Sequence, residues 1–274
     1  MLTLSENLDL QATTAVAKVA SLRKPGRLFV SGMMAGIYMG IGVILMVSTA
    51  GPLLAAGDGF GKLVSGLVFG AALTLTVFAG ADLATSAMMI LPLGVLMRTT
   101  RLGQSAAALG FIVLANAVGA LFFGALIVAS GVLVSNQAAG TMLSDMLASK
   151  AAESPLELFT RGVLCNVLVC LAIWMSSRVR SDGTKIALIF VAITAFIASG
   201  YEHVVANMTT YTIGILTGDP NGTLALYGYN FLWVGLGNLV GGAVVVAFAY
   251  WVIGGRPRLE ILIEEPTSKS ATVK

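Results

Sequence analysis

A single histidine stands inside an apolar stretch of the sequence. His203, the only histidine of the chain, directly follows Glu202 in IASGYEHVVANMT, residues 197–209. An imidazole can donate or accept a hydrogen bond and can change its charge near neutral pH. In a segment that crosses a bilayer, an ionisable side chain is a functional candidate by default. We therefore expect His203 to meet a permeant molecule; the alternative is a hydrogen-bonded core histidine.

Two carboxylates occupy matching places in the two halves of the chain. Asp82 lies two residues after Gly80, and Glu202 lies two residues after Gly200. If a helix breaks at each glycine, the acid can cap free N–H groups of the next helix and meet its positive end. We expect that supporting role for both acids, and a direct role in proton transfer is the alternative.

Two further polar side chains accompany the acids. Thr85 offers a hydroxyl near Asp82, and Asn207 offers an amide near His203. Either side chain can contact a permeant molecule or simply cap a helix. We keep both as candidate pore residues.

The sequence contains few residues that could bind a metal ion or form an enzyme active site. Cys165 and Cys170 are five positions apart on one apolar segment, so a disulfide between them is not expected. One histidine and two cysteines fall short of the three or four ligands that a metal site needs. One histidine and two buried acids are likewise too few for an active site. We expect no metal, no cofactor and no enzymatic activity.

The composition is that of a polytopic all-α membrane protein. The chain is 57% hydrophobic and 11% charged, whereas soluble domains carry about 25% charged residues. Each apolar segment can reach the ~20 residues that span a bilayer. There are six of them: 28–49, 61–97, 104–130, 156–177, 185–217 and 230–254.

Two of these segments are too long for one straight span. As continuous helices, residues 61–97 and 185–217 would each extend roughly 50 Å, against a hydrocarbon core of ~30 Å. Both carry glycine and polar residues near their middles. We therefore predict that the second and fifth transmembrane helices are broken.

Basic residues predict the orientation. Alternate connections and the two ends carry most of the lysines and arginines: Arg23, Lys24, Arg27, Arg98, Arg101, Arg178, Arg180, Lys185, Arg256 and Arg258. The remaining connections carry only Lys62, Lys150 and Arg161. Positive residues favour the cytoplasmic side, so both termini are expected there, in a multi-pass protein of a bacterial cytoplasmic (inner) membrane. The net charge of +3 reflects this bias and gives no reason to expect nucleic-acid binding.

Three regions follow from this pattern. Residues 1–27 are expected to hold a cytoplasmic amphipathic helix over 5–22, with the apolar side formed by Leu8, Ala12, Ala15, Val16, Val19 and Leu22. Residues 28–254 form the six-helix transmembrane domain in contact with lipid. Residues 255–274 form a polar cytoplasmic tail.

The chain contains one design twice. AGADLATSAMM (79–89) matches ASGYEHVVANM (198–208), with the glycines at 80 and 200, an offset of 120. ANAVGALFFGAL (115–126) matches GNLVGGAVVVAF (237–248), with the asparagines at 116 and 238, an offset of 122. A duplicated three-span unit must be inverted, and paired broken helices point to a transport site at the bilayer midplane. Chance matching of glycine-rich apolar sequence is the alternative.

Four large apolar residues lie on the predicted broken helices: Phe69, Leu73, Leu83 and Phe196. Singly, each reads best as core packing. Together they can form constrictions around a polar centre. A bare anion would cross these constrictions only at a high desolvation cost, whereas a neutral acid would cross them without that cost.

These motifs resemble the formate–nitrite transporter family over nearly the whole chain. The resemblance rests on GADLATS (80–86), GVLCNVLVCLAIWMS (162–176), ASGYEHVVANM (198–208) and GNLVGG (237–242), which stand in the family's order. The third and the CNVLVCLAIWMS part of the second are most similar to the nitrite-channel branch.

The resemblance implies a homopentamer of aquaporin-like protomers, each with six spans, broken second and fifth helices and its own pore. It makes His203 the central pore histidine, Thr85 the facing loop threonine, and Phe69, Leu73, Leu83 and Phe196 the constriction. Lys150 matches an outer-side lysine, and Asn166 also matches. The implied substrates are small monovalent anions of weak acids, with nitrite first and formate, hydrosulfide or short carboxylates as alternatives.

One position departs from the family. Ala84 stands where the family usually has phenylalanine, so the cytoplasmic constriction is expected either to be wider or to be repacked by Met88, Met89 or the N-terminal helix.

Rival functions fit less well. A pore for neutral solutes would share an inverted repeat, but the paired Asn-Pro-Ala boxes of water channels do not occur in the sequence. The residues do not separate a channel from a proton-coupled carrier.

Overall fold

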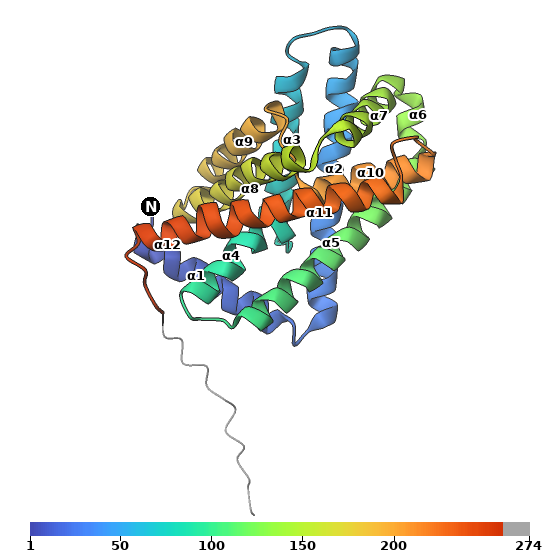
Figure 1. Cartoon of the computed structure of the whole chain (residues 1–274). Coiled ribbons are helices and arrows are strands. Elements are labelled where there is room, and N and C mark those ends of the chain that lie inside the picture. Colours follow the sequence, from blue (N-terminus) through green and yellow to red (C-terminus); the bar gives the residue numbers. More distant parts are fainter. Residues whose placement is uncertain (260–274) are drawn as a thin grey trace, which may run out of the picture.

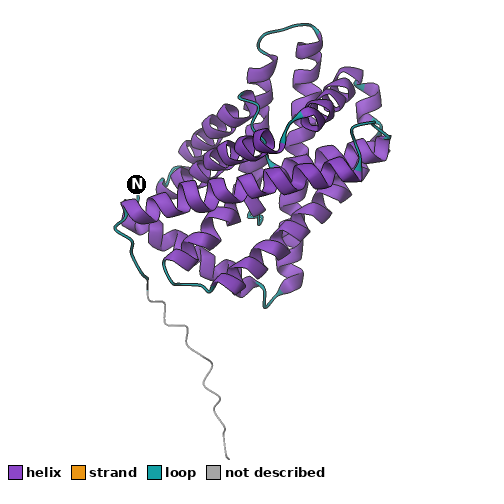
Figure 2. Cartoon of the chain, in the orientation of Figure 1, coloured by secondary structure: helices purple, strands orange, loops and turns teal. Residues whose placement is uncertain are grey.

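The structure, a computed structural model, describes residues 1–259. In this part of the chain every regular element is a helix (Figure 2). The elements are α1 (Leu4–Ser21), α2 (Pro25–Ala55), α3 (Gly61–Ala79), α4 (Ala84–Leu96), α5 (Leu102–Ser130), α6 (Val132–Ser135), α7 (Gln137–Ala152), α8 (Pro155–Arg178), α9 (Asp182–Ala198), α10 (Val204–Thr217), α11 (Leu224–Val240), a π-helix η1 (Gly241–Phe248) and α12 (Ala249–Ile253). Most of the expected C-terminal tail lies outside the described residues.

Five helices of the described part are long and apolar enough to cross a membrane: Pro25–Ala55, Gly61–Ala79, Leu102–Ser130, Pro155–Arg178 and the continuous Leu224–Ile253. Two shorter apolar helices, Ala84–Leu96 and Val204–Thr217, accompany them. The expected all-α membrane class is therefore confirmed.

The two overlong apolar segments each contain two helices. In the first, α3 ends at Ala79 and α4 begins at Ala84; in the second, α9 ends at Ala198 and α10 begins at Val204. Gly80 and Gly200 have φ of 78° and 73°, a left-handed conformation that only glycine adopts without strain. The glycines therefore end α3 and α9 at equivalent points.

Close backbone contact joins α2 to α5 and α8 to the α11–η1 helix. A Cβ on Gly36 would lie 2.1 Å from the carbonyl oxygen of Asn116, and one on Gly119 would lie 2.0 Å from that of Met33. On the other side, a Cβ on Gly237 would lie 2.2 Å from the carbonyl oxygen of Phe159. Only glycine fits at these crossings, where small residues let helix backbones approach each other.

The N-terminal segment forms the expected amphipathic helix. Thr3 and Glu6 make a capping box at the start of α1. Leu8, Ala12 and Ala15 are fully buried, in one apolar cluster with Met89, Leu93 and other residues of α4 and α8. In Figure 1, α1 lies on the opposite side of the bundle from α6, α7 and the α2–α3 connection.

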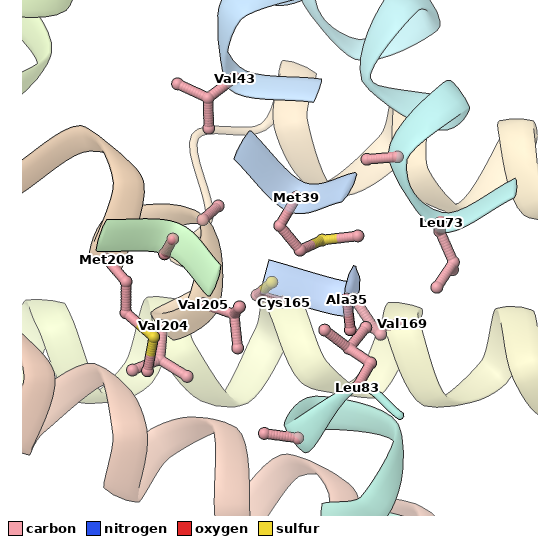
Figure 3. Packing of buried hydrophobic residues seen from close by; sticks show 14 of the residues in the cluster. Ala35, Met39, Val43, Leu73, Leu83, Cys165, Val169, Val204, Val205 and Met208 are labelled. Carbon is pink, nitrogen blue, oxygen red and sulfur yellow. The ribbon is translucent and has the colours of Figure 1, made fainter. Parts of the chain in front are cut away.

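The central core combines residues from both halves of the chain. Figure 3 shows Met39, Leu73, Val169 and Val204 from α2, α3, α8 and α10, with Leu83 from the loop just before α4. Both cysteines are free and buried, Cys165 in this cluster and Cys170 in the cluster under α1. The apolar core therefore reaches the inner end of each interruption, at Leu83 and Val204, whereas Gly80 and Gly200 are exposed.

Candidate functional site

The two helix interruptions bring Thr85 and His203 together. Thr85 Oγ1 lies 3.0 Å from His203 Nε2, and both residues are almost completely buried. His203 is the N-cap of α10, where its Nδ1 accepts a hydrogen bond from the Ala206 N–H at 3.2 Å. In the neutral ring the proton is then on Nε2, which donates to Thr85. His203 thus holds a helix start with one ring nitrogen and presents the other as a donor.

Apolar side chains enclose this pair. The Phe196 ring is stacked on the His203 ring at 6.1 Å between centroids, and Phe69 meets Phe196 edge to face at 6.0 Å. A cavity of about 10 Å³ beside His203 is lined by Met39, Phe69, Leu73, Leu83, Val169, Ile193 and Phe196. That volume is close to the lower limit for one water molecule. The four residues expected at a constriction therefore surround the histidine together.

A larger cavity reaches His203 from the side of α7. It has a volume of about 350 Å³, and its inner end contacts Phe69, Phe196 and His203. We call it the Lys150 vestibule. Its charged lining residues are Lys62, Lys150, Glu153, Arg161 and Glu202. The vestibule shares Phe69, Phe196 and His203 with the small apolar cavity, so its charged lining lies next to the apolar chamber around the histidine.

Lys150 and Glu202 form a buried ion pair in this vestibule. Lys150 Nζ lies 2.5 and 2.6 Å from the two carboxylate oxygens of Glu202. Asn207 Nδ2 donates to the same carboxylate at 2.6 Å and to Asn230 Oδ1 at 2.8 Å. Such hydrogen bonds are what make a desolvated pair tolerable. The structure thus brings the candidate residues Lys150, Glu202 and Asn207 into one network.

The α1 side has a matching ion pair that the sequence analysis missed. Lys18 of α1 contacts the Asp82 carboxylate, and Ser31 Oγ donates to that carboxylate at 2.8 Å. Lys18 lies in the polar N-terminal region, and only its place on the amphipathic helix, three residues after Ala15, could have drawn attention to it.

The expected cap by the two acids is wrong, because neither carboxylate binds the first N–H group of α4 or α10. The first N–H of α4, at Ala84, is bound by Asn116 Oδ1 at 2.9 Å. Asn116 Nδ2 also donates to the carbonyl oxygens of Gly32 and Asp82, at 2.9 and 2.8 Å. The amide reaches the loop from the neighbouring α5, and the Asp82 carboxylate binds Lys18 and Ser31 instead of the helix start.

Asn238 repeats this arrangement at the second loop. Its Oδ1 accepts from the Val204 N–H at 2.9 Å, and its Nδ2 donates to the carbonyl oxygens of Gly162 and Glu202, at 2.8 and 2.9 Å. The sequence marked both asparagines as equivalent, but it gave no sign that they would replace the acids as caps.

Asn166 supports the first loop from α8. Its Nδ2 donates to the carbonyl oxygens of Thr85 and Asn238, at 3.2 and 2.6 Å. The side chain is fully buried, and its Oδ1 has no hydrogen-bond partner among the described residues. It contacts the backbone that carries Thr85, and it is absent from the residues that line the two cavities described above.

Ala84 lies in a filled part of the core. It is fully buried in the cluster that contains Met39, Leu83 and Met88, whereas Met89 belongs to the cluster under α1. The side chains around Ala84 therefore occupy the space next to it.

Fold and site together define a polytopic membrane protein with a polar centre enclosed by apolar side chains and reached through a charged vestibule. A family model described as "Formate/nitrite transporter" matches residues 5–252. The chain belongs to the formate/nitrite transporter family, whose members are transporters and channels and not enzymes.

Individual relatives agree with this assignment. The chain is 42% identical over 239 residues to the nitrite transporter NirC of Salmonella typhimurium, covering 86% of this chain and 87% of that one. It is 31% identical over 271 residues to the formate channel FocA of Escherichia coli, covering 89% and 95%.

Solved structures give the same result. An ion channel of the family superimposes with a TM-score of 0.84 at 36% identity, covering 91% of this chain and 99% of that one. A pentameric formate channel with formate bound gives a TM-score of 0.72 at 26% identity, covering 85% and 98%.

Proposed function

We propose that this protein is a membrane pore for small monovalent anions of weak acids, with nitrite as the preferred anion. The observation that carries the proposal is His203, which lines both the Lys150 vestibule and the small apolar cavity and lies within hydrogen-bond distance of the buried Thr85. The nitrite transporter at 42% identity supports nitrite as the substrate. Formate is the second candidate, supported by the relative and the structure named for it.

The proposed mechanism begins with the vestibule. Positive side chains there, Lys150 among them, attract the anion electrostatically. The apolar chamber formed by Phe69, Leu73, Leu83 and Phe196 rejects a bare charge, because desolvating it is costly. His203 Nε2–H then replaces lost hydration by donating a hydrogen bond to the anion in place of Thr85. When His203 has taken up a proton from the outer solution, the imidazolium can hand one proton to the anion, which then passes as its neutral acid while the ring returns to its neutral form.

We further propose that the pore is an inverted three-plus-three repeat of six spans. In this arrangement α3 with α4 and α9 with α10 form the broken second and fifth helices. The support is the duplicated set of contacts: Asn116 and Asn238 bind equivalent backbone atoms, and each loop has an acid paired with a lysine. The sequence offsets of 120 and 122 follow the same pairs.

Orientation and assembly complete the proposal. The α1 side, with residues 1–27, faces the cytoplasm of a bacterium, because the basic connections lie there, and the sequence places the tail 255–274 in the same compartment. The Lys150 vestibule then opens on the outer side of the cytoplasmic membrane, with residues 28–254 embedded in lipid. A homopentamer is supported by the pentameric formate channel of similar fold.

The deciding experiment is a comparison of nitrite and formate flux into proteoliposomes across external pH from neutral to acidic. We expect nitrite to be faster and both fluxes to rise as pH falls. Faster formate flux would favour the second candidate. Absence of flux for both anions, with the protein shown to be folded and inserted, would contradict the proposed function.

A further inference from the structure

The positive side chains of the Lys150 vestibule differ in how accessible they are to an incoming anion. The Lys150 side chain is 8% exposed, and both oxygens of Glu202 contact its ammonium group. The Arg161 side chain is 38% exposed and lines the same cavity. An incoming anion therefore meets Arg161 more easily than Lys150.

Arg161 is held by a carboxylate of its own. One guanidinium nitrogen, Nη1, donates to Glu153 Oε1. A guanidinium has five N–H donors in a planar fork that matches two oxygens of one anion. The contact to a single oxygen leaves other donors of Arg161 for a second partner.

The Glu153 carboxylate is only partly hydrogen-bonded in this ion pair. Its side chain is 8% exposed, yet Oε2 has no hydrogen-bond partner within the described residues. Oε1 takes the Arg161 contact and a long one of 3.5 Å from Ser149 Oγ. A buried acceptor without a partner is costly. The Arg161–Glu153 ion pair should therefore separate more readily than the Lys150–Glu202 pair, in which both carboxylate oxygens of Glu202 are bound.

Other charges surround Glu153 from each neighbouring element. Lys150 precedes it on α7, Glu157 and Arg161 follow on α8, Glu202 faces it from the loop before α10, and Lys62 of α3 lines the same cavity. Burial, and after it the Glu202 carboxylate, raises the pKa of Glu153 above its ordinary range. Arg161 and Lys150 oppose this shift. Glu153 thus gains a proton at a higher pH than an exposed glutamate does.

We propose that Arg161 is the anion-capture residue of the Lys150 vestibule, and that Glu153 competes with the anion for its guanidinium group. The inference rests on the proposed transport function. Nitrite and formate each carry two oxygens in the planar arrangement of a carboxylate, so either can accept from the fork of Arg161 as Glu153 does. The captured anion then moves inward to His203.

Competition by Glu153 depends on external pH. As pH falls, Glu153 becomes protonated, its charge no longer holds Arg161, and anion capture improves. This effect adds to the titration of the permeant acid. The ratio of wild-type to Glu153→Gln flux cancels the acid's own titration, because both proteins meet the same solution.

The test measures nitrite flux against nitrite concentration for wild type, Arg161→Gln, Arg161→Lys and Glu153→Gln. We expect Arg161→Gln to raise the half-saturating concentration by roughly threefold to tenfold with little change in maximal flux. Arg161→Lys should recover only part of this, because an ammonium lacks the fork. Glu153→Gln should lower the half-saturating concentration at neutral pH. As pH falls, the half-saturating concentration of wild type should approach that of Glu153→Gln.

Lys185→Gln is the matched control, because Lys185 pairs with Asp182 at an exposed position outside the vestibule. Wild-type flux combined with unchanged half-saturation in Arg161→Gln would overturn the capture role and leave the proposed function standing. A wild-type half-saturating concentration in Arg161→Lys would overturn the claim that the planar guanidinium fork is needed to bind the anion. A wild-type to Glu153→Gln ratio that stays constant with pH would overturn the competition. If Arg161→Gln does not fold, Arg161→Lys and Glu153→Gln still decide these points.

Discussion

Thr85 Oγ1 and His203 Nε2 lie within hydrogen-bond distance, 3.0 Å apart, although 118 positions separate the two residues in the sequence. Each stands beside the start of a helix that follows a loop, Thr85 as the second residue of α4 and His203 as the N-cap of α10. The contact exists because two loops from different halves of the chain meet inside one apolar core. The proposed transport mechanism depends on this meeting.

Removal of either member of this pair tests the mechanism. We expect His203→Asn to lower the flux and to weaken its pH dependence to the part that comes from Glu153 and from the permeant acid itself, because asparagine cannot titrate. We expect Thr85→Val to change flux by up to about tenfold, since one net hydrogen bond is worth ~1 kcal/mol. Flux in proteoliposomes measures both effects, with Thr160→Val on the exposed face of α8 as the control. Intact pH-dependent flux in His203→Asn would end the proposed role of the histidine.

The Lys150–Glu202 pair is expected to stabilise the fold only when both partners are present. Lys150→Met or Glu202→Gln alone should cost about 3–5 kcal/mol of unfolding free energy, because each leaves a buried charge without its partner. The double variant should lose less than the sum of the two single losses. Thermal unfolding in detergent provides the measurement. Strictly additive losses would show that the two side chains do not interact.

Asn116 and Asn238 are expected to matter equally for stability. Each replacement by alanine leaves buried backbone groups of one loop without partners, at roughly 1–3 kcal/mol for each group. Asn116→Ala and Asn238→Ala should therefore lower the unfolding temperature by similar amounts. The control Asn221→Ala, in the loop between α10 and α11, should lower it much less. A large effect from one asparagine alone would argue against equivalent loops.

The α2–α5 contact is expected to tolerate no side chain at Gly36. A Cβ there would lie 2.1 Å from a backbone oxygen of α5, whereas a Cβ on Gly26 of the same helix would meet nothing within 4 Å. Gly36→Ala should reduce the yield of folded protein, while Gly26→Ala should not, although both changes remove a glycine from α2. Size-exclusion chromatography distinguishes folded from aggregated material. Equal yields would contradict the close packing.

Ala84→Phe tests the departure from the usual family residue. Ala84 is fully buried, so a phenyl ring must displace neighbours, and overpacking of this kind costs ~1–3 kcal/mol. We expect reduced flux and a changed ratio of nitrite to formate. Unchanged flux and selectivity would show that Ala84 does not set the width of the pore.

Some features of the protein follow from local sequence alone. Hydropathy predicted the membrane class, because apolar runs of this length bury themselves only in lipid or in a bundle. Gly80 and Gly200 marked where the two long segments stop being helical, because positive φ is a local property of glycine. The amphipathic period of residues 5–22 predicted α1 in the same way. His203 stood out as the one histidine of the chain, inside an apolar stretch, and Thr85 by its place in the matching break, whereas Lys150 came only from the resemblance to the family.

Other features were decided only when the helices packed. The acids after the glycines were expected to bind the first N–H groups of α4 and α10, but Asn116 and Asn238 bind those at Ala84 and Val204, because α5 and α11 pass beside the loops. The acids instead bind Lys18 and Lys150, which reach them from α1 and α7. Arg161 and Glu153 are only eight positions apart, yet their place at the mouth of a cavity depends on α3, α7 and α10 as well. Periodicity and composition are read along the chain, whereas a contact between side chains depends on where separate helices cross in space.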